Sequence, residues 1–258
     1  MKILVHAHTT FSGDGELSPR ELAALARRSG FRAVLVTDHF ESLNPDSFRA
    51  LCESCRSIGD CLMVPGYERS WKGYHVLALG ANEWYDDAEI GDWALKVRRH
   101  GGIVVLAHPT RYRHQVPAPI LEACDAVEVW NSKPAYDGSI GPHPSGYLLL
   151  NAARFPVCSQ DLHGVRHLTR VGVELERDCS NSAQVLQCLR SGRYRMTNGL
   201  FRFGRVLPPY AGGMLGLVHL IRRRLVEAAI SARRAARAYS RSGHGSESLR
   251  SLRGTCKH

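Results

Sequence analysis

The sequence predicts an α/β fold built from strand and helix units that repeat between residues 1 and 204. Short runs of β-branched and other apolar residues alternate with segments of helical periodicity, a pattern typical of parallel strands covered by helices. Six or seven such units fit this length, which favours a closed barrel, although an open doubly wound sheet shares the pattern. The 258-residue chain is 44% hydrophobic and 22% charged, so it can bury a core of that size.

Local signals place the individual elements. The first helix has Ser18 as its N-cap, Pro19 at its first position, Glu21 at capping-box spacing and Gly30 as a stop. The other helices are expected at 44–59, 86–102, 117–124, 144–154 and 181–193. Strands are expected at 2–8, 33–39, 61–71, 74–80, 102–109, 126–131, 156–163 and 171–176.

Histidines and carboxylates fall at the ends of these strands. The members are His6, His8, Asp38, His39, Glu68, His75, His108, Asp161 and His163. Since the carboxyl ends of parallel strands in a barrel meet at one rim, these groups should become neighbours. The two-residue spacing of His6 and His8, and of Asp161 and His163, places both members on one side of an extended strand.

Such a cluster predicts a metal centre. A single histidine at a strand end is more often a hydrogen-bonded structural residue, but several buried ionisable groups at one rim must be paired or bound to metal. Imidazole and carboxylate are ligands for zinc, manganese and iron, and the sequence does not choose among them.

Six motifs in this order resemble the PHP (polymerase and histidinol phosphatase) family of metal-dependent phosphoesterases. They are HAHTTFSGDG at 6–15, TDH at 37–39, PGYE at 65–68, HVLALG at 75–80, AHP at 107–109 and SQDLH at 159–163. The resemblance covers residues 1–204 and implies a distorted (β/α)7 TIM-like barrel. It also implies two or three divalent metal ions at the carboxyl rim.

The resemblance implies metal ligands at His6, His8, Asp14, His39, Glu68, His75, His108, Asp161 and His163. It assigns catalytic roles to Glu68 and Asp161, which would contact more than one ion, and to Asp38, which would orient His39 or a neighbouring ligand. One departure from the family pattern is Gly13, which separates Ser12 from Asp14. Asp14 therefore reaches the site only if its loop bulges by one residue, and the third ion depends on it.

The expected reaction is hydrolysis of a phosphomonoester, or of a nucleotide or oligonucleotide phosphate ester. Two cations would share and deprotonate a water, and the third position would hold the phosphoryl oxygens. Only 32 residues separate His75 from His108, which leaves no room for the insertion domain of some nucleotide-processing relatives. Loop cations near the ligands are candidate phosphate contacts, with Arg111 and Arg166 favoured over Arg69, Lys72 and Arg113.

Two other functions compete with this interpretation. One is a non-catalytic metal-binding regulatory module that uses the basic tail to bind nucleic acid or a partner. A degenerate site would be expected to lose ligands, and this chain keeps nearly the full set. The other is an amidohydrolase-type hydrolase, which also begins with H-x-H but normally has a bridging lysine at a strand end. No lysine is expected at a strand end of this chain.

The C-terminal part has a different character. Residues 205–240 predict a linker and a basic amphipathic helix, with Met214, Val218, Ile221 and Leu225 at helical spacing. Residues 241–258 are expected to form a disordered tail. Residues 214–258 contain ten Lys and Arg against two Asp and Glu, so they carry most of the formal net charge of +10. The helix could dock on the barrel, bind nucleic acid, or bind an anionic membrane or partner protein.

The remaining features fit a cytoplasmic protein. The amino terminus makes a poor signal peptide, and no apolar run approaches the ~20 residues that span a bilayer. Among eight cysteines, Cys52, Cys55 and Cys61 superficially resemble a zinc knuckle. They lack a fourth ligand nearby, so buried reduced thiols are the favoured interpretation. The oligomeric state is left open.

Overall fold

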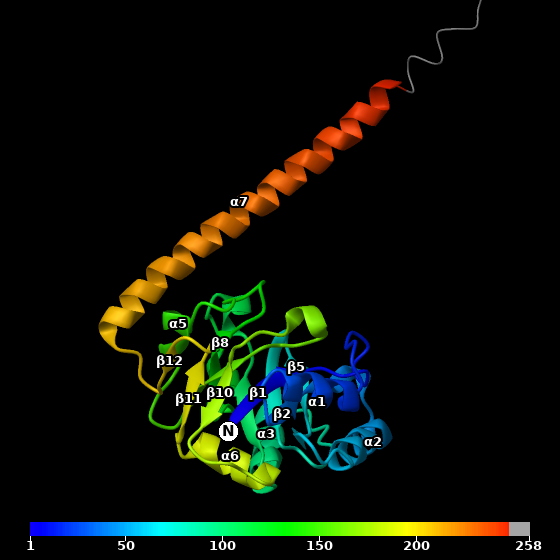
Figure 1. The fold of residues 1–258 in the computed structure, drawn as a ribbon, viewed down its shortest axis with the longest axis vertical. Helices are drawn as coiled ribbons and strands as arrows, with labels where there is room; N and C mark the ends of the chain where they lie inside the picture. Colours follow the sequence, from blue (N-terminus) through cyan, green and yellow to red (C-terminus); the bar gives the residue numbers. More distant parts are fainter. Residues whose placement is uncertain (248–258) are drawn as a thin grey trace, which may run out of the picture. The chain divides into compact units, whose positions relative to one another are not determined.

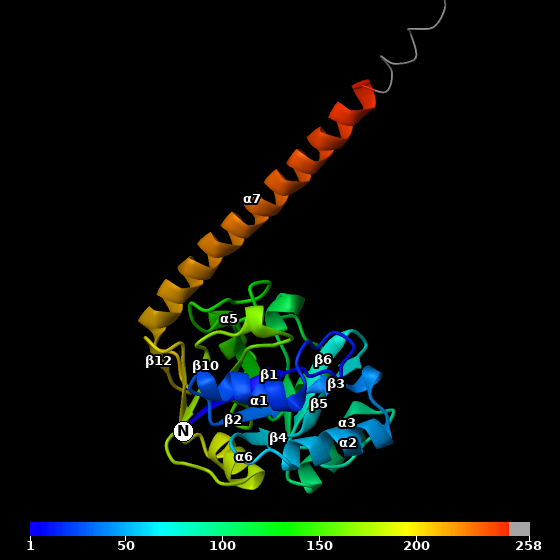
Figure 2. The same ribbon diagram turned by 45° about the vertical axis from the view of Figure 1, so that its right-hand side comes forward.

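The computed structural model describes the backbone of residues 1–247 and the side chains of residues 1–232. The chain divides into two compact units, Met1–Leu215 and Gly216–His258. The first unit is a mixed α/β structure with two six-stranded sheets and helices packed around them (Figures 1 and 2). The α/β class predicted from the sequence is therefore confirmed for this unit.

The first sheet has the strand order β12-β11-β10-β1-β2-β4. Strands β1, β2 and β4 are parallel, whereas β10, β11 and β12 join them as antiparallel neighbours. The bounds are β1 Lys2–Ala7, β2 Ala33–Val36, β4 Leu62–Val64, β10 Gly172–Leu175, β11 Tyr194–Thr197 and β12 Arg202–Phe203. Strands β11 and β12 were not expected from the sequence.

The second sheet has the strand order β3-β5-β6-β7-β8-β9. Strand β6 is antiparallel to both of its neighbours, and the other pairs are parallel. The bounds are β3 Asp38–His39, β5 Gly66–Trp71, β6 Tyr74–Leu79, β7 Ile103–Leu106, β8 Ala126–Asn131 and β9 Phe155–Ser159. Both faces of β7 and β8 are buried, as expected for continuous apolar runs.

The two sheets are connected at both margins. Strand β2 continues through Thr37 into β3, and β4 continues through Pro65 into β5. On the other margin, the amide of Gln160 donates to the carbonyl of Val5 at 3.0 Å, and that of Leu162 donates to the carbonyl of His6 at 3.1 Å. The strands are nevertheless assigned to two sheets, so the closed seven-stranded barrel stays a prediction.

Helices α1 (Pro19–Arg28), α2 (Pro45–Arg56), α3 (Ile90–Arg99) and α6 (Ser182–Arg190) lie outside the strands (Figures 1 and 2). The capping box of Ser18 and Glu21 is present at the start of α1. Each of these helices buries an apolar stripe, such as Leu22, Ala23 and Ala26 of α1. Helix α4 (Ala118–Glu122) matches its prediction, but α5 (Pro144–Tyr147) is much shorter than the predicted 144–154.

A close backbone approach explains one glycine at the junction of the sheets. A Cβ atom on Gly66 would lie 2.2 Å from the carbonyl oxygen of Ala78 and 3.0 Å from that of Val36. Only glycine therefore lets β5 approach β6 and β2 this closely. The next-but-one residue, Glu68, is thereby fixed beside the ends of the neighbouring strands.

Helix α7 extends over Pro209–Glu247, so it begins within the predicted linker and continues beyond residue 240, where the helix was expected to end. Residues 248–258, the rest of the predicted tail, lie outside the described residues. Apolar side chains of α7 such as Leu217, Ile221 and Leu225 are exposed. Its basic amphipathic role stays a prediction. In the described part of the chain, no helix combines the length and apolar character needed to cross a membrane.

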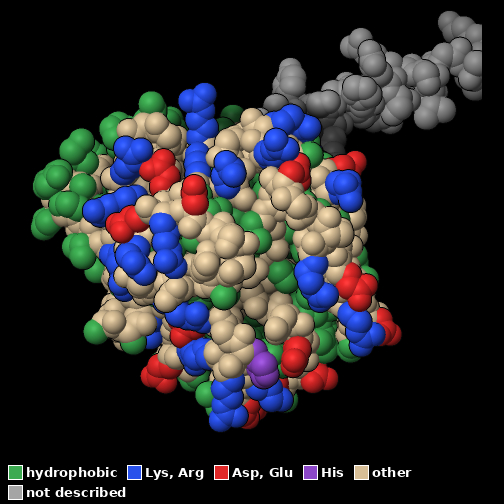
Figure 3. All heavy atoms as spheres, turned by 60° about the horizontal axis from the view of Figure 1, so that its bottom comes forward, with side chains coloured by type: hydrophobic (Ala, Val, Ile, Leu, Met, Phe, Trp, Pro, Cys, Tyr) green, Lys and Arg blue, Asp and Glu red, His purple; other side chains and the backbone are tan. Residues whose placement is uncertain are grey.

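Charged side chains are mixed on the face seen from the bottom of Figure 1. Figure 3 shows Lys and Arg side chains there with Asp and Glu side chains among them.

Candidate metal centre

All nine predicted ligands meet at the strand ends. They form four overlapping groups in which the ligand atoms lie within 4.8 Å of one another: His8, Asp14, His39 and His163; His6, His8 and Glu68; His6, His108 and Asp161; and Glu68, His75 and His108. The ligands come from segments separated by more than 150 residues, as the alternation of strands and helices predicts. Among the described residues, no cysteine belongs to such a group.

Three of these residues occupy the left-handed region of backbone space. The φ angles are 66° for His6, 30° for His108 and 49° for Asp161. The pairing of β1 with β2 shifts register between Val5 and Ala7, so His6 occupies a bulge rather than a regular strand position. The expectation of an extended strand at His6 and His8 was therefore wrong, although their Nε2 atoms still meet at 3.1 Å.

Glu68 of β5 lies at the middle of the cluster and is buried. Its Oε1 atom is 2.8 Å from His75 Nδ1 and 3.1 Å from His108 Nε2. Its Oε2 atom is 3.2 Å from His39 Nδ1, 3.5 Å from His8 Nε2 and 3.6 Å from His6 Nε2. One carboxylate thus faces five imidazoles, which suits a group shared between ions.

Glu128 of β8 holds His6 in position, and the sequence analysis missed it. His6 Nδ1 donates to Glu128 Oε1 at 2.7 Å, because a carboxylate can only accept. In the neutral form that binds a metal, this places the lone pair of His6 on Nε2, toward the cluster. Glu128 Oε2 accepts from the His108 amide at 2.7 Å and from Asn131 Nδ2 at 3.0 Å, so both oxygens are satisfied away from the ligand groups. A carboxylate inside the buried run AVEVWN was the signal that could have identified it.

Lys133 is a second residue that the sequence analysis missed. It follows the end of β8 by two residues, and its Nζ atom donates to Asp161 Oδ2 at 2.8 Å. Asp161 Oδ1 faces the other way, 3.4 Å from His8 Nε2 and 3.6 Å from His6 Nε2. Lys133 thus contacts the cluster from the loop after β8 and not from a strand end.

The loop after β1 brings Asp14 into the cluster. Asp14 Oδ2 is 3.1 Å from His163 Nε2 and 3.4 Å from His39 Nε2. A Cβ atom on Gly15 would lie 1.9 Å from the Thr9 carbonyl oxygen, whereas one on Gly13 would meet nothing within 4 Å. The tight fold of the loop thus depends on Gly15, and the extra Gly13 is accommodated in open space.

Asp38 organises this loop instead of contacting the ligand atoms. Its carboxylate accepts hydrogen bonds from the amide and hydroxyl groups of Thr9 and of Ser12, at 2.6–3.1 Å. The Ser12 hydroxyl in turn accepts from the His39 amide at 2.8 Å. Asp38 belongs to none of the four ligand groups of the described residues. Asp38 directly precedes His39 in β3, and hydrogen bonds through Ser12 also connect its carboxylate to the His39 amide.

Burial and charge set the protonation of the cluster. Burial disfavours the charged form of His6, but Glu128, Glu68 and Asp161 together outweigh it and raise the pKa of His6 well above its ordinary value. Burial also opposes ionisation of Glu68, yet His6 and hydrogen bonds from His108 and His39 hold its pKa well below the usual range. For His8 burial dominates and lowers the pKa to about 4, so this imidazole stays neutral, the form that binds a metal.

The predicted phosphate contacts differ in their surroundings. Arg166 is mostly exposed, and its Nη2 atom is 3.0 Å from Glu16 Oε1. Arg111 lies beside Tyr136, whose ring stacks on that of His108 with centroids 4.8 Å apart. The guanidinium of Arg69 lies 4.3 Å from the Phe40 ring centroid and 4.2 Å from that of Trp71, so it serves packing.

The donor set fits divalent metal ions. Imidazole nitrogens and carboxylate oxygens alternate around buried space, and the Nδ1 atom of buried His108 has no hydrogen-bond partner within the described residues. The two Nε2 atoms of His6 and His8 face the same carboxylates. Cations would neutralise Glu68 and Asp161 there and satisfy nitrogens that protein groups leave unpaired.

Comparisons with known proteins agree with this description. Residues 5–108 match the family model of the PHP domain, which confirms the resemblance predicted from the sequence. Among curated proteins, none matches the chain.

Solved structures show a related fold. A two-domain protein from Bacteroides vulgatus, containing a predicted PHP-like metal-dependent phosphoesterase, aligns with a TM-score of 0.60 and 18% identity. The alignment covers 79% of this chain and 65% of that one, so this chain spans less than two thirds of its length. At this identity the likeness shows the fold alone.

Two further structures each align with a TM-score of 0.45 and cover 63% of this chain. One is a "putative metal-dependent phosphoesterase" from Bifidobacterium adolescentis, 18% identical, with 87% of that chain covered. The other is an amidohydrolase from Chromobacterium violaceum with bound sulfate and no metal, 14% identical, with 88% of that chain covered.

Proposed function

We propose that this protein is a metal-dependent phosphoesterase that hydrolyses a phosphomonoester or a nucleotide or oligonucleotide phosphate ester. The observation that carries the proposal is the meeting of nine imidazole and carboxylate side chains in four overlapping ligand groups. The match of residues 5–108 to the PHP domain supports it. We further propose that the strands act as one barrel, with this cluster at its carboxyl rim.

The four groups would hold two or three divalent ions of zinc, manganese or iron. The inner ions would be held by His6, His8, Glu68, His75, His108 and Asp161, and the outer one by Asp14, His39 and His163 together with His8. When bound, such ions supply Lewis acidity that activates water and offsets the charge developing on the phosphoryl oxygens. Glu68 and Asp161, buried between imidazoles, are the groups that ions would share.

The chain's own residues orient these ligands and the substrate. Glu128 fixes the tautomer and ring of His6, and the Asp161 carbonyl does the same for His163 by accepting from its Nδ1 at 2.9 Å. Lys133, whose side chain is 24% exposed, can exchange its contact with Asp161 for a phosphate oxygen. Arg111 is the second cation that we assign to the phosphate. Arg166 could bind it only by leaving Glu16.

The direct test is an assay of the full chain loaded with manganese, zinc or iron. The substrates are p-nitrophenyl phosphate, its bis ester, histidinol phosphate, short oligonucleotides and, for the amidohydrolase alternative, a cyclic amide. His8→Ala should abolish turnover and lower bound metal, because it removes a ligand common to two groups. His100→Ala is the matched control, since His100 is 43% exposed and lies outside the cluster.

The outcomes separate the candidate functions. Turnover of phosphate esters that disappears in His8→Ala supports the proposal. Bound metal without turnover of any ester would favour the non-catalytic module, and turnover of only the cyclic amide would favour the amidohydrolase class. Undiminished ester hydrolysis by His8→Ala would contradict the mechanism.

A further inference from the structure

A pair of thiols lies at the end of the strands opposite the metal centre. Cys179 follows β10, and Cys188 lies in α6. Their Sγ atoms are 3.8 Å apart, and both are free thiols. The side chain of Asn181 caps α6 by accepting from the Gln184 amide at 3.0 Å, so the turn between the two cysteines is ordered.

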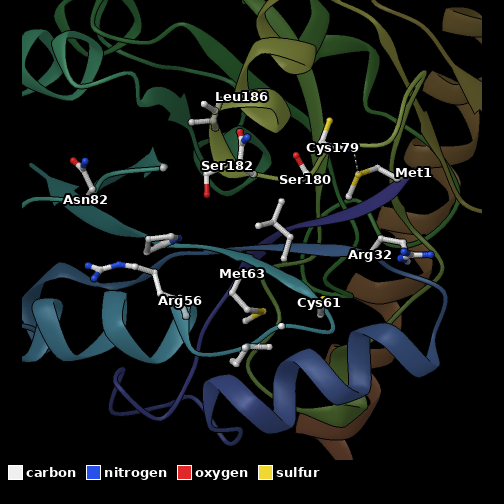
Figure 4. A pocket seen from close by; sticks show the side chains of 18 of the residues that line it. Met1, Arg32, Arg56, Cys61, Met63, Asn82, Cys179, Ser180, Ser182 and Leu186 are labelled. Carbon is white, nitrogen blue, oxygen red and sulfur yellow. Dashed lines mark hydrogen bonds between the residues drawn. The ribbon is translucent and has the colours of Figure 1, made fainter.

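The two thiols differ in access to solvent. Cys188 is completely buried, whereas Cys179 is partly exposed and lines an open cavity of about 760 Å³. Figure 4 shows Cys179 on the wall of this cavity, beside Met1 and Ser180. A small oxidant can therefore reach the Cys179 thiol directly, whereas the Cys188 thiol is shielded from solvent. The other described cysteines are all buried.

A guanidinium group stands beside the buried thiol. Arg177 Nε donates to Cys188 Sγ at 3.3 Å, and Arg177 Nη2 donates to Gln187 Oε1 at 3.0 Å, which holds the group in place. The arrangement thus has an accessible thiol and, within reach of it, a second thiol that accepts a hydrogen bond from a guanidinium group. A thiol that has lost its proton is the nucleophile in disulfide formation.

We infer that Cys179 and Cys188 form a peroxide-sensitive oxidation site that closes to a disulfide. The Cys179 thiol gives up its proton and attacks hydrogen peroxide, the O–O bond breaks, and sulfenic acid and hydroxide form. This hydroxide takes the proton from the thiol and becomes the first water. Cys188 thiolate then attacks Cys179 Sγ, the S–O bond breaks, and the leaving hydroxide takes a proton to become water. Two thiols are oxidised by two electrons in total, and one peroxide is reduced to two waters. The sulfur atoms need to approach by about 1.8 Å to reach bonding distance.

The disulfide would fasten the turn before α6 without contacting the metal centre. The Cys179 amide donates to Met1 Sδ at 3.0 Å, and the α-amino group donates to the Leu175 carbonyl at 2.9 Å, so this turn also holds the start of β1. Closing the short loop from 179 to 188 should raise Tm by about 5 °C. The inference does not depend on the proposed function.

The test uses the full chain, reduced and then titrated with hydrogen peroxide. Trypsin cuts after Arg177 and Arg190, so one peptide, residues 178–190, contains both cysteines. We expect this peptide to become lighter by two hydrogen atoms and to lose both alkylation sites. Dithiothreitol should restore them. Hydrolytic turnover, if present, should not change.

Variants make the inference falsifiable. In Cys188→Ser the Cys179 sulfenic acid should persist and be trapped by dimedone, and in Cys179→Ser the peptide should stay unoxidised. Cys124→Ser, in which a buried and distant thiol is removed, should behave like the unmodified chain. The inference is overturned if residues 178–190 keep both alkylation sites at peroxide levels that oxidise free cysteine added to the same sample. It is also overturned if Cys179 is oxidised in the unmodified chain without forming the disulfide.

Discussion

The two ends of the strands differ in what they contain. At the carboxyl ends, ionisable side chains are buried against one another, and His6, His108 and Asp161 adopt left-handed backbone angles. At the opposite end the structure has a cavity of about 760 Å³, with a mixed lining that includes Cys61, Met63 and Leu186. Buried charge and strained backbone thus identify the candidate metal centre at the carboxyl ends, whereas the cavity lies at the opposite end of the strands.

Replacing Glu128 tests whether the cluster at the carboxyl ends depends on residues that hydrogen-bond to the candidate ligands. In Glu128→Ala we expect apparent metal affinity and turnover to fall by about 10- to 100-fold, because His6 loses the acceptor that fixes its tautomer. Metal titration followed by activity measurement at saturating metal checks this.

Glu174→Gln is the control for Glu128→Ala. Glu174 lies on β10 and is partly exposed, and its Oε2 atom is 2.6 Å from Arg202 Nε. If Glu128→Ala has a lower Tm but an unchanged metal affinity, the role of Glu128 is limited to packing.

Lys133→Met should have a smaller effect. Losing one charge-assisted contact to phosphate should lower kcat/KM by about 10-fold, mainly through KM, and weaken inhibition by inorganic phosphate. Metal content should stay the same. Lys96→Met, which removes a partly exposed lysine paired with Asp87, is the matched control. Unchanged KM and unchanged phosphate inhibition would refute the assignment of Lys133 to substrate.

At the opposite end, Leu186→Ala should affect stability alone. Leu186 is 3% exposed and lines the cavity, so its truncation should lower the free energy of unfolding by ~2 kcal/mol. Denaturant unfolding measures this change, and turnover and metal content should equal those of the unmodified chain. A marked loss of turnover at equal folded fraction would show that the two ends are coupled.

The fold could be predicted from the sequence where local signals were strong. The caps and apolar stripe of α1 gave its bounds nearly to the residue, and the apolar runs of β2 and β8 were recognised as buried strands. Residues 194–203 lacked such a signal, because β11 and β12 have only four and two residues and depend on the pairing of β11 with β10 and of β12 with β11. In α3, Trp93 and Val97 are buried, but Leu95 is 43% exposed because it lies on the outer face of the helix.

The meeting of the candidate ligands could be predicted because strand ends gather residues that are distant in sequence. Glu128 could not, since it lies inside β8 and belongs to no motif at a strand end. Lys133 was missed because it lies in the loop after β8, two positions beyond Asn131, and loop direction is not encoded in periodicity. The role of Asp38 depends on how the loop at 9–15 folds back, which Gly15 permits and which no single motif reveals.

The left-handed backbone angles of His6, His108 and Asp161 imply a conflict between stability and function. Each such angle costs about 1 kcal/mol for a residue that carries a Cβ atom, and glycine would avoid that cost. Laboratory evolution for heat tolerance alone should therefore drift toward glycine at these positions, and reimposing a requirement for activity should reverse the drift.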